Sequence, residues 1–205
     1  MTYTLYSMQN SGNCYKPRLL MHQLGIPFRL VDTDSFDGST RTPEYLALNP
    51  NGKVPFLILP DGRKLAESNA MLLHLAEGTP YLPADKYERA LSYQWLFFEQ
   101  YSHEPYIAVA RSWLHLIPEG RARLDEERLT ELHTRGHMAL RVMETRLGEA
   151  PWFAGDAYSV ADIALYAYTH VAGDGDFDLT PYPRVRDWLG RVASLPRHVG
   201  MDWRP

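Results

Sequence analysis

The segment Ser11-Gly12-Asn13-Cys14 places a hydroxyl, an amide and a thiol within four consecutive residues. It lies between a predicted strand and a predicted helix, where a helix N-terminus offers unpaired N–H groups and the positive end of its dipole. An anionic sulfur is stabilised there, and a serine hydroxyl can donate a hydrogen bond to it. Serine replaces the first cysteine of a C-x-x-C motif, so disulfide exchange within the motif is impossible. A polar turn in which Asn13 or Cys14 caps the helix explains the segment equally well.

A second segment, Asn49-Pro50-Asn51-Gly52-Lys53-Val54-Pro55, leads into an almost continuous apolar run at 54–59. A proline at the start of a buried strand removes one hydrogen-bond donor from the ladder. A cis peptide bond that leaves nearby backbone groups available to a ligand would explain it. The alternative is a trans proline on an edge strand, and the segment taken by itself favours that alternative.

A third segment, Glu67-Ser68, precedes a helix predicted at 69–77. The Ser68 hydroxyl and backbone N–H can bind a carboxylate at the helix N-terminus. The Glu67 carboxylate beside it can attract an ammonium group, so the pair suits an amino-acid-like zwitterion. A simple N-cap is the more common use of a serine at this position.

The elements that must position these three segments fall in the first third of the chain. Apolar patterning predicts strands at 3–7, 28–32, 54–59 and 63–66 and helices at 15–24 and 69–77. The strand–helix–strand order predicts a right-handed parallel pair, to which the later hairpin adds an antiparallel strand. The α/β part therefore extends over 1–78, and 79–86 reads as a linker.

The remainder, 87–205, is predicted to be all-helical because the strand signals stop after the linker. Helices are expected at 87–116, with a kink or break at Pro105, at 124–147, from 159 and at 183–195. Ser159 and Asp162 match a capping box and are interpreted as structural. We therefore expect Asp162→Ala to destabilise the fold.

Composition limits the functions that are open to this chain. Hydrophobic residues are 45% of the 205 and charged residues 22%, which is typical of a globular protein with a sizeable core. A net charge of -4 argues against a nucleic-acid partner, which needs a concentrated basic surface. The single cysteine permits no intramolecular disulfide and favours a reducing compartment. There is no signal-peptide pattern, and the longest apolar run, 163–168, is too short to cross a membrane, so we expect a cytoplasmic protein.

The order and spacing of four segments resemble those of the cytosolic glutathione transferases. They are Ser11-x-Asn13-Cys14, Asn49-Pro50-x-Gly52-Lys53-Val54-Pro55, Leu65-x-Glu67-Ser68-x-Ala70-Met71 and Ser159-Val160-Ala161-Asp162-Ile163-Ala164. The resemblance implies a thioredoxin-like glutathione-binding domain over 1–78 and a helical-bundle C-terminal domain over 87–205. It also implies a homodimer, glutathione as co-substrate, and a role in detoxification.

The resemblance further assigns roles to individual residues. Val54 would bind the cysteinyl part of glutathione through its backbone, with Pro55 cis. Glu67 and Ser68 would hold the γ-glutamyl end, and Lys53 would approach the glycyl carboxylate.

The catalytic group is left open among three neighbours. Ser11 matches the catalytic serine of the theta- and zeta-like classes, and Asn13 matches the asparagine of the bacterial nu-like class. Cys14 matches the catalytic cysteine of the beta-like class when the motif is aligned on cysteine. Aligned on the serine, it falls where theta-like enzymes carry a non-catalytic cysteine.

The implied reaction is attack of the glutathione thiolate on a small hydrophobic electrophile between the domains. Tyr106 and Trp113 are candidates for the wall of that pocket, and Arg111 for polarising the substrate. The alternatives are a glutathione-dependent disulfide oxidoreductase or peroxidase, and a non-catalytic glutathione- or ligand-binding protein. No metal is expected, because the spaced pair His133 and His137 has no evident third ligand.

Overall fold

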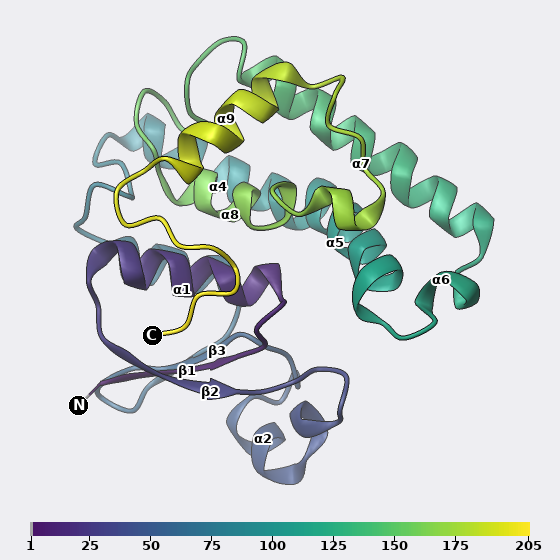
Figure 1. The fold of residues 1–205 in the computed structure, drawn as a ribbon. Coiled ribbons are helices and arrows are strands. Elements are labelled where there is room, and N and C mark those ends of the chain that lie inside the picture. The colour runs from purple at the N-terminus through teal and green to yellow at the C-terminus, as the bar shows by residue number, and fades with distance from the viewer. Residues whose placement is uncertain (1) are drawn as a thin grey trace. The chain divides into compact units, whose positions relative to one another are not determined.

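Strand β1 (Tyr3–Ser7) lies between β2 (Phe28–Asp32) and β3 (Phe56–Ile58) in a four-stranded sheet of order β2-β1-β3-β4 (Figure 1). The computed structural model describes residues 2–205. β1 and β2 are parallel, whereas β3 is antiparallel to β1 and to β4 (Lys64–Leu65). The predicted parallel pair and antiparallel hairpin are thus confirmed, although the two hairpin strands are shorter than predicted.

Three helices accompany this sheet. α1 (Gly12–Leu24) ends at Gly25, whose φ of 69° is left-handed, and α1 packs against α3 (Ser68–Ala76). α2 (Pro43–Leu48) lies toward the other side of the sheet from α1 (Figure 1) and was not predicted. Its start carries the usual signals, since Thr42 accepts a hydrogen bond from the Tyr45 N–H and proline follows at the first helical position.

The second unit, Gly78–Leu195, is built from helices, as predicted. They are α4 (Lys86–Phe98), α5 (Glu104–Arg111), α6 (Gly120–Arg123), α7 (Glu126–Arg146), α8 (Val160–Thr169) and α9 (Pro183–Ala193). Short 3-10 segments occur at Ser39–Arg41 in the first unit and at Ala172–Gly175 in the second. None of the described helices combines the length and apolarity needed to cross a membrane.

The expected break at Pro105 takes the form of a widened helical turn. Between α4 and α5, Glu99–His103 is π-helical, and the Glu104 N–H bonds the carbonyl of Glu99 five residues back. Proline has no N–H, and its ring collides with the carbonyl four residues earlier, so an ordinary α-helical turn cannot continue through it. A second π-helical turn, Ser112–Leu116, follows α5.

The start of α8 is fixed by the predicted capping box. The Ser159 hydroxyl accepts from the Ala161 N–H at 3.2 Å, and Asp162 Oδ2 accepts from the Ser159 N–H at 3.0 Å. Asp162 Oδ1 also accepts from Trp188 Nε1 of α9 at 3.0 Å. The carboxylate therefore ties the beginning of one buried helix to the middle of another.

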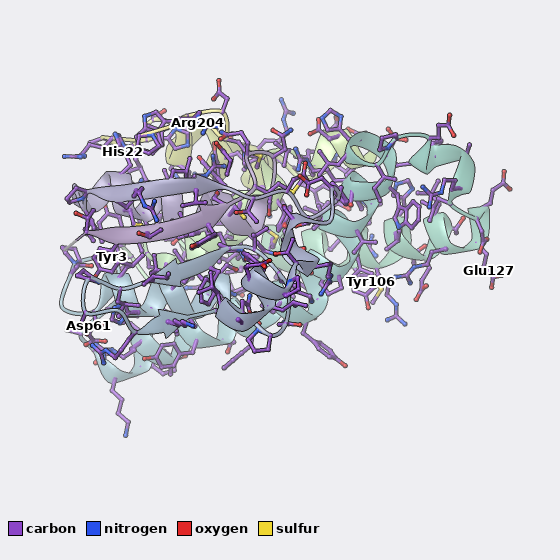
Figure 2. The ribbon with its side chains drawn as sticks, turned by 90° about the horizontal axis from the view of Figure 1, so that it is seen from below. Tyr3, His22, Asp61, Tyr106, Glu127 and Arg204 are labelled. Atoms are coloured by element: carbon purple, nitrogen blue, oxygen red, sulfur yellow. The ribbon has the colours of Figure 1, made fainter. Side chains whose placement is uncertain are left out.

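The last ten residues differ from the predicted boundaries. Pro196–Pro205 packs with the residues up to Glu77, not with the helical unit. The Tyr15 hydroxyl donates to the Val199 carbonyl at 2.5 Å, and Arg204 pairs with Asp32 at 2.6 Å. Arg204 and His22 lie along the same side of the sheet (Figure 2). The segment has no helical periodicity, so its place depends on partners distant in sequence.

Candidate active site

Ser11 stands at the N-terminus of α1, as predicted. It is the N-cap residue, and its half-buried Oγ accepts a hydrogen bond from the Cys14 N–H at 3.3 Å. A hydroxyl that accepts one hydrogen bond still carries its own hydrogen to donate. The 13-residue helix behind it presents the positive end of its dipole at this point. An anionic sulfur placed beside Ser11 would be stabilised by both effects.

Asn13 and Ser68, which sequence spacing placed in separate motifs, come together at the starts of α1 and α3. The Ser68 hydroxyl donates to Asn13 Oδ1 at 3.1 Å. Lys16 joins them from one turn further along α1, with Nζ 2.8 Å from Asn13 Oδ1 and 3.3 Å from Ser68 Oγ. The structure therefore links a predicted catalytic residue directly to a predicted binding residue.

Lys16 was missed in the sequence, although a signal was present. A lysine near the beginning of a predicted helix opposes the helix dipole, which favours anions at that end. Its side chain is fully buried, and lysines are rarely buried without partners. A lysine at a helix start beside a candidate anion site is the sequence pattern that indicates this residue.

Two side chains hold the 49–55 loop at the Lys53 carbonyl, one from the loop itself and one from α2. The Asn49 amide donates to the Lys53 carbonyl at 2.8 Å, and the Tyr45 hydroxyl donates to the same carbonyl at 2.8 Å. Burial raises the pKa of Tyr45 to about 12, so the hydroxyl remains a donor at neutral pH. The Val54–Pro55 peptide bond is cis, as the resemblance implied. Val54 is half-buried, whereas the Lys53 side chain is exposed.

Glu67 and Ser68 differ by one position from the predicted cap. Ser68 is the first residue of α3 and is buried, while Glu67 is the exposed N-cap residue and makes no side-chain cap hydrogen bond. Glu67 has a φ of 67°, a left-handed conformation that costs a non-glycine residue on the order of 1–3 kcal/mol. Backbone strain of this kind gathers at ligand-binding positions.

Cys14 has the properties of a structural thiol. Its side chain is buried, and Sγ accepts a hydrogen bond from the Met8 N–H at 3.3 Å. Burial raises the pKa of the thiol above its ordinary value, although the hydrogen bond from Ser11 acts in the opposite direction. Reactive cysteines are partly exposed and have lowered pKa values. The environment of Cys14 therefore favours Ser11 and Asn13 as the chemical groups of this segment.

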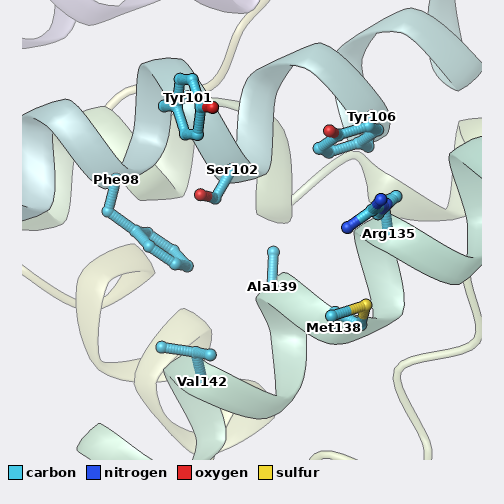
Figure 3. Close-up of a pocket in the computed structure, with 8 residues that line it drawn as sticks. All are labelled: Phe98, Tyr101, Ser102, Tyr106, Arg135, Met138, Ala139 and Val142. Carbon is cyan, nitrogen blue, oxygen red and sulfur yellow. The ribbon is translucent and has the colours of Figure 1, made fainter.

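The three residues predicted for the electrophile pocket are dispersed. Tyr106 lines a hollow of about 310 Å³ between α7 and the segment from α4 to α5 (Figure 3). Of the described residues, eight line this hollow, and Arg111 and Trp113 are not among them. Arg111 is buried with Nε 3.0 Å from Asp174 Oδ2, and Trp113 lies under the Arg123 guanidinium at 5.7 Å.

The histidine pair on α7 makes contacts within the helical unit. His133 Nε2 lies 2.9 Å from the Gly175 carbonyl oxygen, and His137 Nδ1 lies 2.9 Å from the Tyr182 hydroxyl. Burial lowers the pKa of His137. Across residues 2–205, no group of three or more His, Cys, Asp or Glu side chains is arranged to hold a metal ion.

The thioredoxin-like sheet with its adjoining helices, followed by a helical unit, defines a class of two-domain proteins. Residues 10–77 match the family description "Glutathione S-transferase, N-terminal domain", and residues 126–191 match "Glutathione S-transferase, C-terminal domain". The chain belongs to the glutathione S-transferase family.

Three relatives illustrate its range. The disulfide-bond oxidoreductase YfcG of Escherichia coli is 32% identical, over 90% of this chain and 87% of its own. A crystal structure of a glutathione S-transferase from Pseudomonas fluorescens is 50% identical, covers 98% of this chain and 99% of its own, and superposes with a TM-score of 0.92. A glutathione transferase from Burkholderia graminis, crystallised with two glutathione molecules per subunit, is 26% identical, covers 96% of this chain and 85% of its own, and has a TM-score of 0.84.

Proposed function

We propose that this protein is a glutathione transferase in which Ser11, assisted by Asn13, stabilises the thiolate of bound glutathione for attack on a small hydrophobic electrophile. The observation that carries the proposal is the position of Ser11. Its hydroxyl lies half-buried at the N-terminus of a long helix. The neighbouring thiol of Cys14 is buried and has a raised pKa, so the nucleophile is supplied by glutathione and not by the protein.

The tripeptide would lie along the segments that surround Ser11. The backbone N–H groups at the N-terminus of α3, which begins at Ser68, suit the γ-glutamyl carboxylate, and the exposed Glu67 carboxylate suits its ammonium group. The Val54 backbone would pair with the cysteinyl part, and exposed Lys53 would reach the glycyl carboxylate. The relative from Burkholderia graminis was crystallised with glutathione bound, which supports glutathione as the ligand.

The expected stabilisation is large enough for a thiolate at neutral pH. A free cysteine thiol has a pKa of about 8.5, and lowering it by about 2 units requires about 2.7 kcal/mol. A hydrogen bond to a charged group supplies roughly 1.5–3 kcal/mol, and a helix N-terminus adds about 0.3–1 kcal/mol. Ser11 and α1 together can therefore meet the requirement.

In the proposed step, the glutathione thiol first loses its proton to solvent. The sulfur lone pair then forms a bond to the electrophilic carbon. In a substitution, the leaving group departs with the electrons of its bond to that carbon. In an addition, the electrons of the activated double bond shift away from the attacked carbon, and the product is then protonated. The Ser11 hydroxyl donates a hydrogen bond to the sulfur for as long as the thiolate is bound.

Disulfide exchange is a second candidate, favoured by the relationship to the E. coli disulfide-bond oxidoreductase. The same thiolate would attack one sulfur of a disulfide, forming a mixed disulfide and expelling the other sulfur as a thiolate. A second glutathione thiolate would then release the remaining thiol and form glutathione disulfide. This version also uses Ser11 and requires no reactive protein cysteine.

Calorimetric titration with reduced glutathione and with glutathione disulfide, on the wild type and on Ser11→Ala, tests the proposal. Titrations in two buffers of different ionisation enthalpy count the protons released. We expect proton release with reduced glutathione in the wild type and its loss in Ser11→Ala. Proton release that survives in Ser11→Ala would contradict the assigned role, and preference for the disulfide would move the reaction to redox chemistry.

We also infer a cytoplasmic homodimer, in which a second copy covers the face around the hollow on α7. Large apolar residues are exposed there, with exposed fractions of 85% for Tyr101, 45% for Met138 and 47% for Val142. Contiguous exposed apolar surface of this kind marks interaction sites. Analytical ultracentrifugation should give a dimer for the wild type and a monomer for Tyr101→Asp, whereas a monomeric wild type would contradict the inference.

A further inference from the structure

Lys16 is a fully buried lysine at the point where α1 and α3 begin. Burying an ammonium group away from water is costly unless several hydrogen bonds compensate for the lost hydration. Lys16 Nζ lies 2.8 Å from Asn13 Oδ1, 3.3 Å from Ser68 Oγ and 3.1 Å from Asn69 Oδ1. These acceptors come from both helices, and two of them belong to residues assigned to glutathione.

The contacts of Lys16 determine which way its partners face. A lysine side chain can only donate hydrogen bonds, so the Asn13 atom 2.8 Å away must be the amide oxygen. The NH₂ group of Asn13 is therefore the end directed away from Lys16. The Ser68 hydroxyl accepts from Lys16 and donates its hydrogen to Asn13 Oδ1 at 3.1 Å, so its orientation is fixed as well.

We propose that Lys16 is a positioning residue for glutathione activation, which holds the amide oxygen of Asn13 so that the NH₂ group of Asn13 faces the thiolate. This inference rests on the proposed function of the same site. It adds a cation that contacts no substrate atom but orients the Asn13 amide, which does. It also explains why a lysine stands near a helix start, where the dipole disfavours it.

The variant Lys16→Met keeps an unbranched side chain of similar length and removes the ammonium group. We expect it to bind reduced glutathione about tenfold more weakly and to lower the ultraviolet thiolate absorbance of the complex. Lys86→Met, at an exposed position at the start of α4, is the matched control and should change neither quantity. Circular dichroism and thermal unfolding establish that each variant is folded.

A double-mutant cycle with Asn13→Ala separates positioning from a purely structural role. If Lys16 acts on the thiolate through Asn13, Lys16→Met should cost no further thiolate absorbance once Asn13 is alanine. Fully additive losses would overturn the inference, and so would a folded Lys16→Met with unchanged affinity and absorbance. If Lys16→Met does not fold, Lys16→Leu, which also lacks hydrogen-bond donors, replaces it in the same cycle with the same criteria.

Ser11→Ala, measured alongside, distinguishes the two proposals. Loss of the thiolate in Ser11→Ala together with its retention in Lys16→Met refutes only the role of Lys16. Retention of the thiolate in Ser11→Ala refutes the proposed function itself.

Discussion

Asp162 is a carboxylate buried at the start of α8, surrounded by groups that donate hydrogen bonds to it. Besides Ser159 and Trp188, the Phe153 N–H donates to Oδ1 at 3.3 Å. Burial nevertheless raises the pKa of Asp162 to about 6, because desolvation outweighs these donors. A carboxylate whose pKa in the folded protein exceeds its unfolded value binds protons more strongly in the folded state.

This shift makes stability depend on pH in a defined direction. The contribution of Asp162 is fully present below pH about 4, the unfolded pKa, and is lost as pH rises through the folded pKa near 6. Relative to the non-titrating variant Asp162→Asn, the wild-type free energy of unfolding should fall by about 2 kcal/mol between pH 4 and pH 7. Urea unfolding of both proteins at three pH values measures the difference. A difference that is constant or rises with pH would refute the prediction.

Cys14 provides a second prediction for a single side chain. Because it is buried and its pKa is raised, we expect iodoacetamide to leave it unmodified in the native protein at neutral pH and to alkylate it once urea unfolds the chain. Mass spectrometry of the intact protein reports the modification. Rapid native alkylation, or loss of glutathione-dependent activity in Cys14→Ala, would restore the cysteine as a candidate nucleophile.

At the scale of elements, local signals predicted most of the first unit. The apolar patterns of 3–7 and 28–32 define β1 and β2 with their observed bounds, since strands and helices depend mainly on local periodicity. The cap of α3 was misplaced by one residue, because serine is the usual N-cap residue and nothing local indicates that Glu67 adopts a left-handed conformation. The hydrogen bonds of Lys16 depend on the contact between α1 and α3, which the sequence does not display.

Two glycines permit a matched comparison: Gly52 in the loop between α2 and β3, and Gly62 in the turn between β3 and β4. Gly52 has a φ of 60°, and a Cβ there would collide with the Arg41 guanidinium and lie 2.9 Å from the Thr40 carbonyl oxygen. Gly62 also has a left-handed φ, 87°, with no atom within 4 Å of the added Cβ.

Gly52→Ala should therefore lower the free energy of unfolding by more than Gly62→Ala, by about 1–3 kcal/mol, because only Gly52 adds a collision to the backbone strain. Gly52→Ala should also weaken glutathione binding, since it displaces the loop that carries Lys53 and Val54. Urea unfolding and calorimetry of both variants provide the comparison. Equal losses in the two variants would show that the collision has no effect.

At the scale of the molecule, the first unit is completed by the other end of the chain. Gln9 Nε2 donates to the Met201 carbonyl at 2.7 Å, and the Trp203 ring lies 4.5 Å from the His22 ring and 6.4 Å from that of Phe28. The Arg18 guanidinium donates hydrogen bonds to the Gln9 carbonyl at 2.7 Å and to the Trp203 carbonyl at 3.4 Å. The partners at Met201 and Trp203 lie more than a hundred residues from the side chains that they contact, so no local pattern could have indicated them.

The C-terminal segment should consequently affect the site as well as stability. Trp203→Ala removes a half-buried ring, and we expect it to lower the free energy of unfolding by about 2 kcal/mol, less than a fully buried tryptophan would cost. Gln9 lies two residues before Ser11, so the same variant should weaken glutathione binding severalfold. The exposed neighbour Asp202→Ala is the control and should match the wild type in both measurements. If Trp203→Ala loses stability but binds glutathione normally, the C-terminal segment stabilises the unit without positioning Ser11. The loop at Gln9 would then keep its conformation without the Trp203 contacts.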